Sequence, residues 1–195
     1  MGITPPGLSR AAVAADYSSG GMFRIAETVL GADTASIDIT GIPADYKSLI
    51  VEANLRSTAA ATFDTVLLAV NNDTTDANYR AQSFQSSNTT STAAQNIGAA
   101  AVRGQVFATG AQSTTNDFGR IRLVIPDYTS ALASKSIQME NEAMLTRNSG
   151  GLLLRRAMLC WLSTSVINRL TFTCSANFLT GSSVSVYGVR SANPS

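Results

Sequence analysis

The chain of 195 residues contains no histidine. This absence excludes Ser-His-Asp and Cys-His catalysis, histidine-ligated zinc and acid–base catalysis by imidazole. The chain also lacks a run of about 18 apolar residues, so no membrane-spanning helix is expected. The sequence has neither a glycine-rich phosphate loop nor a Cys-x-x-Cys pair. We therefore expect no catalytic residues, no cofactor and no metal site.

Cysteine is scarce, with only Cys160 and Cys174 present. Both lie among apolar residues such as Leu159, Trp161 and Phe172. Free cysteine is commonly buried, and burial raises the thiol pKa, so two reduced and buried thiols are predicted. A disulfide between the two segments is the alternative. Trp161 is predicted to be a core residue rather than a platform for a sugar.

Net charge is also small, because 14 basic residues oppose 13 acidic ones. The chain therefore has no global field that would attract nucleic acid or an anionic membrane, and neither is expected as a partner. Among the basic residues only Lys47 and Lys135 are lysines. Arginine is enriched at buried interfaces, although a compositional bias explains this preference equally well.

What the sequence does contain is strict alternation of apolar and polar residues. One series falls in residues 48–56 and a second in residues 120–125. Alternation with a period of two is typical of strands that are buried on one face. The predicted core positions are Leu49, Val51, Ala53, Leu55, Ile121, Leu123 and Ile125.

Many such short segments follow one another, separated by turns rich in Gly, Pro and Asn. No segment keeps a helical period over three turns. The pattern predicts an all-β fold, an antiparallel two-sheet sandwich that is jelly-roll-like, over residues 22–195. Residues 86–101 consist mostly of Ser, Thr, Asn, Ala and Gln, and we predict a long exposed loop there.

Residues 1–21 are predicted to form an extended N-terminal docking arm. Two adjacent prolines favour an extended start, and the Ser-Ser-Gly-Gly end favours a linker. Such a short polar segment buries too little surface to order itself, so it is expected to bind across a subunit boundary. The predicted contact residues are Ile3, Pro5, Pro6, Leu8, Val13 and Tyr17.

Three polar groupings are candidate sites. Asp73 and Asp76 lie in an Asn-rich loop that suits either calcium or, with more weight, a plain hairpin turn. Glu140 and Glu142 share a strand face, with Glu52 on another strand. They suit either a glycosidase carboxylate pair or, with more weight, a solvated face. The third grouping consists of five arginines, which suit either a basic stripe that binds nucleic acid or, more simply, neutral pairing across strands with these glutamates. It contains Arg120, Arg122, Arg155, Arg156 and Arg169.

Residues 23–189 resemble a family of tailed-bacteriophage virion structural proteins. The resemblance rests on "IAETVLGADTASIDITGIPADYKSLIVEANLRS" at residues 25–57 and "AATFDTVLLAVNNDTTDANY" at residues 60–79. It includes Pro126-Asp127-Tyr128 after a hydrophobic strand and Val186-Tyr187-Gly188-Val189 near the end. Where the family has Asn-Gly-Asp in the hairpin, this chain has Asn71-Asn72-Asp73. A type I′ turn accepts Asn there, so the hairpin is expected to persist.

The resemblance implies a place in a virus particle and supplies no catalytic residues. The expected function is that of a non-enzymatic capsid decoration or cement protein on the particle surface, made in the cytoplasm of the bacterial host. The expected partners are further copies of itself, as a trimer, and the major capsid protein or other virion proteins. A tail-associated fibre or knob protein that contacts a host surface glycan is the alternative, and a carbohydrate-active enzyme is the third and least favoured class.

Overall fold

The computed structural model describes residues 21–87, 90–98, 102–146 and 151–190. The predicted contact residues of the arm, from Ile3 to Tyr17, lie outside these ranges. The strands are β1 (Gly21–Val29), β2 (Thr34–Thr40), β3 (Ser48–Leu55), β4 (Phe63–Val70), β5 (Tyr79–Ser87), β6 (Thr90–Ile97), β7 (Val106–Thr109), β8 (Gly119–Pro126), β9 (Lys135–Thr146), β10 (Gly151–Trp161), β11 (Arg169–Phe178) and β12 (Ser183–Arg190). One 3-10 turn, η1 (Asp76–Asn78), precedes β5. No helix in these ranges has the length and apolar character needed to cross a membrane.

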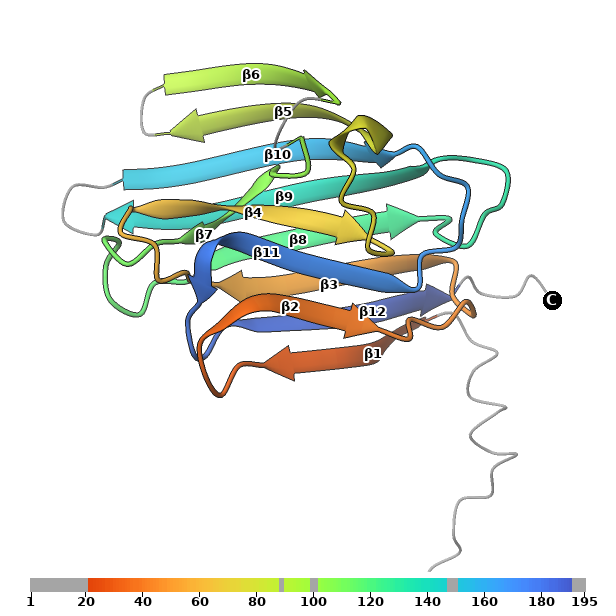
Figure 1. Ribbon diagram of the computed structural model, residues 1–195, viewed down its shortest axis with the longest axis horizontal. Helices are drawn as coiled ribbons and strands as arrows, with labels where there is room; N and C mark the ends of the chain where they lie inside the picture. Colours follow the sequence, from red (N-terminus) through yellow and green to blue (C-terminus); the bar gives the residue numbers. More distant parts are fainter. Residues whose placement is uncertain (1–20, 88–89, 99–101, 147–150, 191–195) are drawn as a thin grey trace, which may run out of the picture.

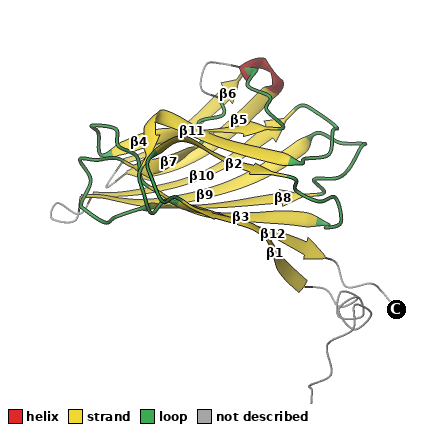
Figure 2. Ribbon diagram, turned by 60° about the horizontal axis from the view of Figure 1, so that its bottom comes forward, coloured by secondary structure: helices red, strands yellow, loops and turns green. Residues whose placement is uncertain are grey.

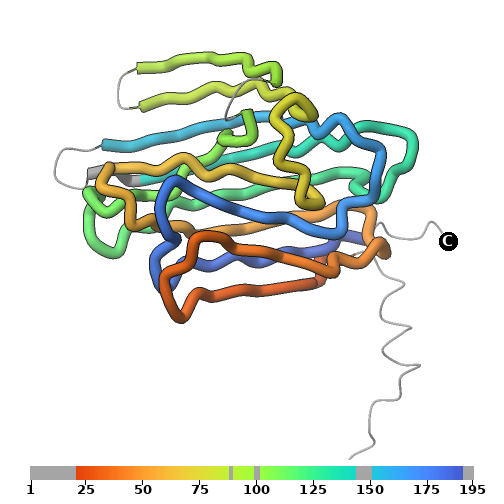
Figure 3. The backbone as a smooth tube through the Cα atoms, in the orientation of Figure 1, coloured from red at the N-terminus to blue at the C-terminus, as the bar shows by residue number. Residues whose placement is uncertain are grey.

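The strands form two antiparallel sheets that pack face to face (Figures 1 and 2). The larger sheet has eight strands in the order β1-β12-β3-β8-β9-β10-β5-β6, and the smaller has four in the order β2-β11-β4-β7. The antiparallel two-sheet sandwich predicted from the sequence is confirmed. The smooth trace in Figure 3 shows the chain crossing repeatedly from one sheet to the other.

The strand order also accounts for the unequal size of the sheets. Four strands of the larger sheet, β1-β12-β3-β8, face the four of the smaller one, β2-β11-β4-β7. This interleaved order is the double-sheet jelly roll. The hairpins β5–β6 and β9–β10 are inserted between its strands and join the larger sheet as β9-β10-β5-β6. We call these four strands the extension.

The core lies between the jelly-roll sheets, where the alternating segments were predicted to point. Leu49 pairs in register with Ile125, and Val51 with Leu123, and none of the four is exposed to solvent. From the smaller sheet, Phe172 is equally buried. Because apolar side chains occupy alternate positions in strands such as β3 and β8, these strands bury one face and leave the other to solvent.

Asn141, near the start of the extension, is a buried polar residue in β9. Its Oδ1 accepts a hydrogen bond of 2.9 Å from the Phe107 backbone N–H. Its Nδ2 donates to the Phe107 carbonyl at 3.0 Å and to the Arg120 carbonyl at 2.9 Å. Phe107 lies in β7, the edge of the smaller sheet, so this one amide links the two sheets.

Residues 86–101 differ from the prediction of a long loop. β5 continues to Ser87, and β6 pairs with it in unbroken register from Thr90 to Ile97. The prediction of a loop was wrong, although the segment is exposed as expected, because a strand can form here without burying either face. A strand with no buried face needs no alternation of apolar residues, so backbone pairing with β5 leaves no mark in the side-chain pattern.

The substitution Leu123→Asp tests the core. It places a charge without a partner in the apolar interior, so we expect the free energy of unfolding to fall by about 3–5 kcal/mol. Chemical denaturation measures the change. Gln138→Asp, an exposed substitution on the adjacent strand β9, is the control and should melt like wild type. Equal stability of the Leu123 variant and wild type would contradict the assignment of this face to the core.

Candidate functional site

The solvent-facing side of the larger sheet, which we call the outer face, carries two rows of side chains that register places side by side. In the first row, Glu52 of β3 lies opposite Arg122 of β8, which lies opposite Glu140 of β9. The row continues to Arg156 of β10 and Phe84 of β5. We call Glu52, Arg122, Glu140 and Arg156 the charge ladder, because opposite charges alternate from strand to strand.

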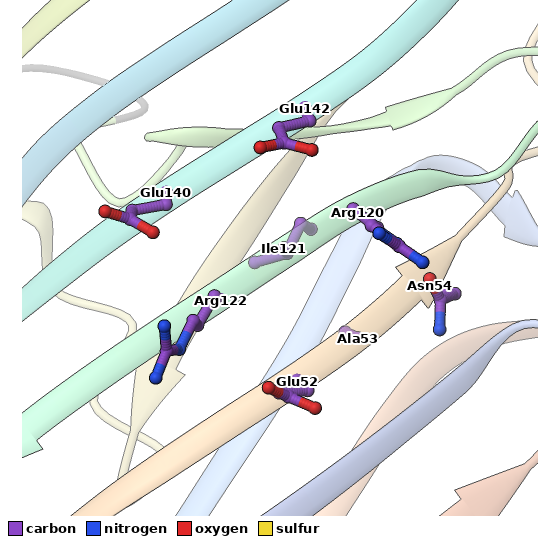
Figure 4. Close-up of a pocket in the computed structure, with 8 residues that line it drawn as sticks. All are labelled: Glu52, Ala53, Asn54, Arg120, Ile121, Arg122, Glu140 and Glu142. Carbon is purple, nitrogen blue, oxygen red and sulfur yellow. The ribbon is translucent and has the colours of Figure 1, made fainter.

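A second row runs parallel to the first. Asn54 lies opposite Arg120, Arg120 opposite Glu142, and Glu142 opposite Leu154. Figure 4 shows Asn54 on β3, Arg120 on β8 and Glu142 on β9, with Arg120 directed towards Asn54. Directly opposed positions in an antiparallel pair bring opposite charges close enough to attract each other. Both rows are therefore locally neutral.

The members of both rows that lie on β3, β8 and β9 line an open hollow of about 440 Å³. At its far side Arg156 forms an ion pair with Glu140, with 2.9 Å between Nη2 and Oε1. The Arg156 side chain is 80% exposed, so this pair contributes little to stability. The hollow thus presents charged groups that are available for contact with another molecule.

Apolar side chains border the hollow on the extension. Two further hollows, of about 310 and 320 Å³, continue along the outer face over β10 and β5, and Phe84 lines both. Phe84 is 55% exposed and Leu154 is 54% exposed, and Leu152 and Met158 on the same face are also exposed. Exposed apolar side chains beside a charged surface are typical of protein contact sites.

The carboxylates that the sequence suggested do meet, because Glu52, Glu140 and Glu142 line one hollow. The register places Arg120 opposite Glu142 and Arg122 opposite Glu140, as the cross-strand interpretation expected, while the ion pair with Glu140 is formed by Arg156. The five-arginine stripe is not formed, because two of its members lie elsewhere.

Arg155 faces the interior side of the extension. Its Nη2 donates to Ser83 Oγ at 2.9 Å and to Gln105 Oε1 at 2.7 Å, and its guanidinium lies 4.9 Å from the centre of the Phe107 ring. Arg169 pairs with Asp38 in the smaller sheet. Both residues therefore have structural partners away from the outer face.

The Asn-rich loop begins with the predicted tight turn at Asn71 and Asn72, closed by a bridge between Val70 and Asp73. The predicted hairpin is wrong, because the flanking strands β4 and β5 belong to different sheets and do not pair. Asn71 and Asn72 have positive φ angles of 50° and 61°, the signature of a type I′ turn. The Asp73 carboxylate accepts hydrogen bonds from Trp161 Nε1 at 2.8 Å, Asn78 Nδ2 at 2.9 Å and the Thr75 backbone N–H at 3.0 Å. These donors explain Asp73 as a turn residue.

Asp76, the other carboxylate of this loop, pairs with Arg103 at 2.9 Å. The described part of the chain has no group of three or more Asp, Glu, Cys or His side chains placed to hold a metal ion. Trp161 is 4% exposed, which confirms its prediction as a core residue. Its indole also connects the end of β10 to the tight turn at Asp73.

Burial raises the pKa of Asp73. The hydrogen bonds from Trp161, Asn78 and Thr75 together lower this pKa by more than burial raises it, so the pKa lies below its ordinary value of 3.8. A lowered folded-state pKa means that the ionised carboxylate stabilises the fold. This stabilisation is complete above the unfolded-state pKa and is lost as the pH falls through the folded-state pKa.

We therefore expect Asp73→Asn to be less stable than wild type at neutral pH, by about 1 kcal/mol, because a charged acceptor of several hydrogen bonds is lost. The difference should narrow as the pH falls below 3.8. Urea denaturation across this range measures it. Asp45→Asn, at an exposed position, is the control. A constant difference between the Asp73 variant and wild type at every pH would contradict the assignment.

The two cysteines are free and half-buried, and they lie in different sheets, Cys160 in β10 and Cys174 in β11. The reduced state is as predicted, while the burial is less complete. Burial raises the pKa of the Cys174 thiol to about 12, with the nearby Asp64 carboxylate adding to the effect. Cys174 is therefore a weak nucleophile.

Sequence reasoning missed the apolar border of the outer face. A signal was available, because alternate positions of β10 place Leu152, Leu154, Arg156 and Met158 on one face. Three apolar residues on a face that also carries an exposed arginine indicate a contact surface rather than a core.

Comparisons with protein-family models, with curated proteins and with solved structures found no match. The interpretation of the outer face therefore rests on the chain's own residues.

Proposed function

We propose that this protein is a non-enzymatic structural component of a tailed-phage particle, and specifically a capsid decoration protein on the particle exterior. In this proposal it assembles with further copies of itself, as a trimer, and binds the major capsid protein. The sequence resemblance of residues 23–189 supports the virion assignment. The jelly roll agrees with it, although a fold shared by viral capsid and lectin domains does not determine function.

The observation that carries the proposal is the composition of the outer face. Opposite charges alternate along the charge ladder, and exposed Phe84 and Leu154 lie beside it. Protein interfaces combine apolar anchors with a polar rim of complementary charges, which fix the register of the partner. A face with this composition suits docking on another folded protein.

The same geometry argues against the enzyme class. Glycoside hydrolysis by two carboxylates requires one carboxyl group that keeps its proton, which enzymes secure with an apolar setting. Glu140 lies in register between Arg122 and Arg156, and its side chain is 47% exposed. Neither the charges nor the solvent exposure supplies such a setting, so we assign Glu140 to binding rather than catalysis.

A second candidate is a tail-associated fibre or knob protein that contacts a host surface glycan. The observation in its favour is the open hollow lined by Glu52, Asn54, Arg120 and Glu142. Planar amide, carboxylate and guanidinium groups in a shallow site can hydrogen-bond sugar hydroxyl groups. The apolar border over β10 and β5 favours a protein partner instead.

Copy number distinguishes these functions. Quantitative mass spectrometry of purified particles should find hundreds of copies if the protein decorates the capsid and a few to dozens if it belongs to the tail. Particles from a phage in which the gene is deleted are the control. Absence of the protein from purified wild-type particles would overturn the virion assignment as a whole.

Arg122→Glu tests the outer face directly. It places a third negative charge between Glu52 and Glu140, so we expect binding to particles that lack the protein to weaken by about tenfold or more while the exposed position leaves folding intact. Thr40→Glu, at an exposed position on the smaller sheet, is the matched control and should bind like wild type. If Arg122→Glu decorates particles normally, the docking surface lies elsewhere.

A further inference from the structure

The larger sheet ends at β6, and this edge lacks the features that normally prevent an edge strand from pairing with another chain. β6 contains no charged residue and no proline. It pairs with β5 without a bulge and is exposed along nearly its whole length. No described strand pairs with its far side. Long, neutral and regular edge strands are templates for pairing with a further strand.

The other three sheet edges are protected. β1 has a register shift between Arg24 and Ala26, and Arg24 forms an ion pair with Glu27 at 2.6 Å. β2 carries Asp38, which is paired with Arg169 of the neighbouring strand. β7 is only four residues long, is buried throughout and is held by Asn141. Among the four sheet edges formed by the described strands, β6 is therefore the one without such protection.

We propose that β6 pairs with β6 of a second copy of this chain, antiparallel, about a twofold axis perpendicular to the sheet at the Ala93–Ala94 centre of the strand. In this symmetry each residue faces one on the same side of the sheet, and one of the two alanines faces itself. A pairing centred on Ala93 places Ser91 opposite Gln95 and Thr92 opposite Ala94.

The second copy is the occupant that the strand itself specifies. In the pair centred on Ala93, all opposed side chains of β6 from Thr90 to Asn96 are small or polar, so no like charges meet and no bulky groups collide. Strand addition gains affinity from backbone hydrogen bonds, which any regular neutral edge supplies equally on both sides. An edge built to select a different protein would carry charges or pockets that recognise it, and β6 has no charge of either sign.

Pairing at β6 also joins the outer faces of the two copies. Phe84 lies in register with Ala93, and both line the hollow nearest this edge. Exposed Ile97 lies at the end of the same strand. The pair therefore forms one continuous sheet, with the apolar border of each copy near the shared axis. This contact is distinct from the proposed trimer contact, because a twofold contact joins only two copies. It is also independent of the proposed virion role, which the copy-number measurement tests separately.

Cysteine cross-linking tests the proposal. Ala93→Cys and Ala94→Cys are made separately in the full chain and treated with a short bifunctional thiol reagent. Directly opposed side chains in an antiparallel pair lie about 4.5–5.5 Å apart at Cβ, within reach of the reagent. We expect a covalent dimer as the main product for at least one variant. A denaturing gel counts only covalent pairs, so other contacts between copies do not affect the result.

Ala35→Cys is the matched control, since Ala35 is also an exposed alanine on an edge strand, β2. Wild type reports any reaction of the half-buried Cys160 and Cys174. The proposal is overturned if neither variant gives more dimer than Ala35→Cys.

A second measurement does not depend on cross-linking. Ala93→Lys places like charges near the twofold axis, and we expect it to raise the dissociation constant of the pair by about tenfold or more in sedimentation experiments. The position is exposed, so the variant should keep the wild-type melting temperature. Unchanged association of this variant would equally overturn pairing through β6.

Discussion

The side-chain amide of Asn141 is the interaction on which the geometry of the candidate site depends. A strand normally satisfies its backbone groups with a neighbouring strand, but the outer edge of β7 has none in the smaller sheet. Asn141 takes that place by accepting from the Phe107 N–H and donating to its carbonyl. Its further bond to the Arg120 carbonyl ties β8 into the same network. Because buried backbone groups must be paired, this amide fixes β9 at the junction of the two sheets.

Fixing β9 determines where the charges of the outer face lie. Side chains alternate between the two faces of a strand, so the inward position of Asn141 sends Glu140 and Glu142 outward. Register then sets their neighbours, with Arg122 opposite Glu140 and Arg120 opposite Glu142. A slip of one residue would bring the glutamates into the core and Asn141 into solvent. The charge ladder is thus a consequence of the buried amide as much as of the charges themselves.

The sequence predicted those parts of the fold that bury one face. The burial of Leu49 and Leu123 is predicted by the alternation of apolar and polar residues, and the turn at Asn71 is predicted by its residue type. The extension could not be predicted in the same way. β6 has no buried face, and the orientation of Arg155 depends on Phe107 and Gln105, which are distant in sequence.

The candidate site was predictable in part for the same reason. The face shared by Glu140 and Glu142 follows from their spacing alone, whereas their union with Glu52 and Arg122 requires the strand order. Strand order in a jelly roll is set by which strands cross between sheets, and that information lies in the whole chain rather than in any one segment. The local sequence pattern therefore predicts which side chains share a strand face. Which strands bring those faces together in one site follows only from the assembled sheet.

The extension differs from the jelly roll in how it treats its apolar side chains. The jelly roll buries most of its apolar side chains between two sheets, with Met22 and Val29 of the edge strand β1 as exposed exceptions. Its edges β1, β2 and β7 are closed by a bulge, an ion pair and a buried amide. The extension buries side chains such as Leu159 on its inner face, but its outer face leaves Phe84, Leu154 and Ile97 in solvent. Exposing such side chains on a folded monomer brings no gain in stability and raises the risk of aggregation. Their concentration on the inserted hairpins is explained if those hairpins are covered by another chain in the assembled state.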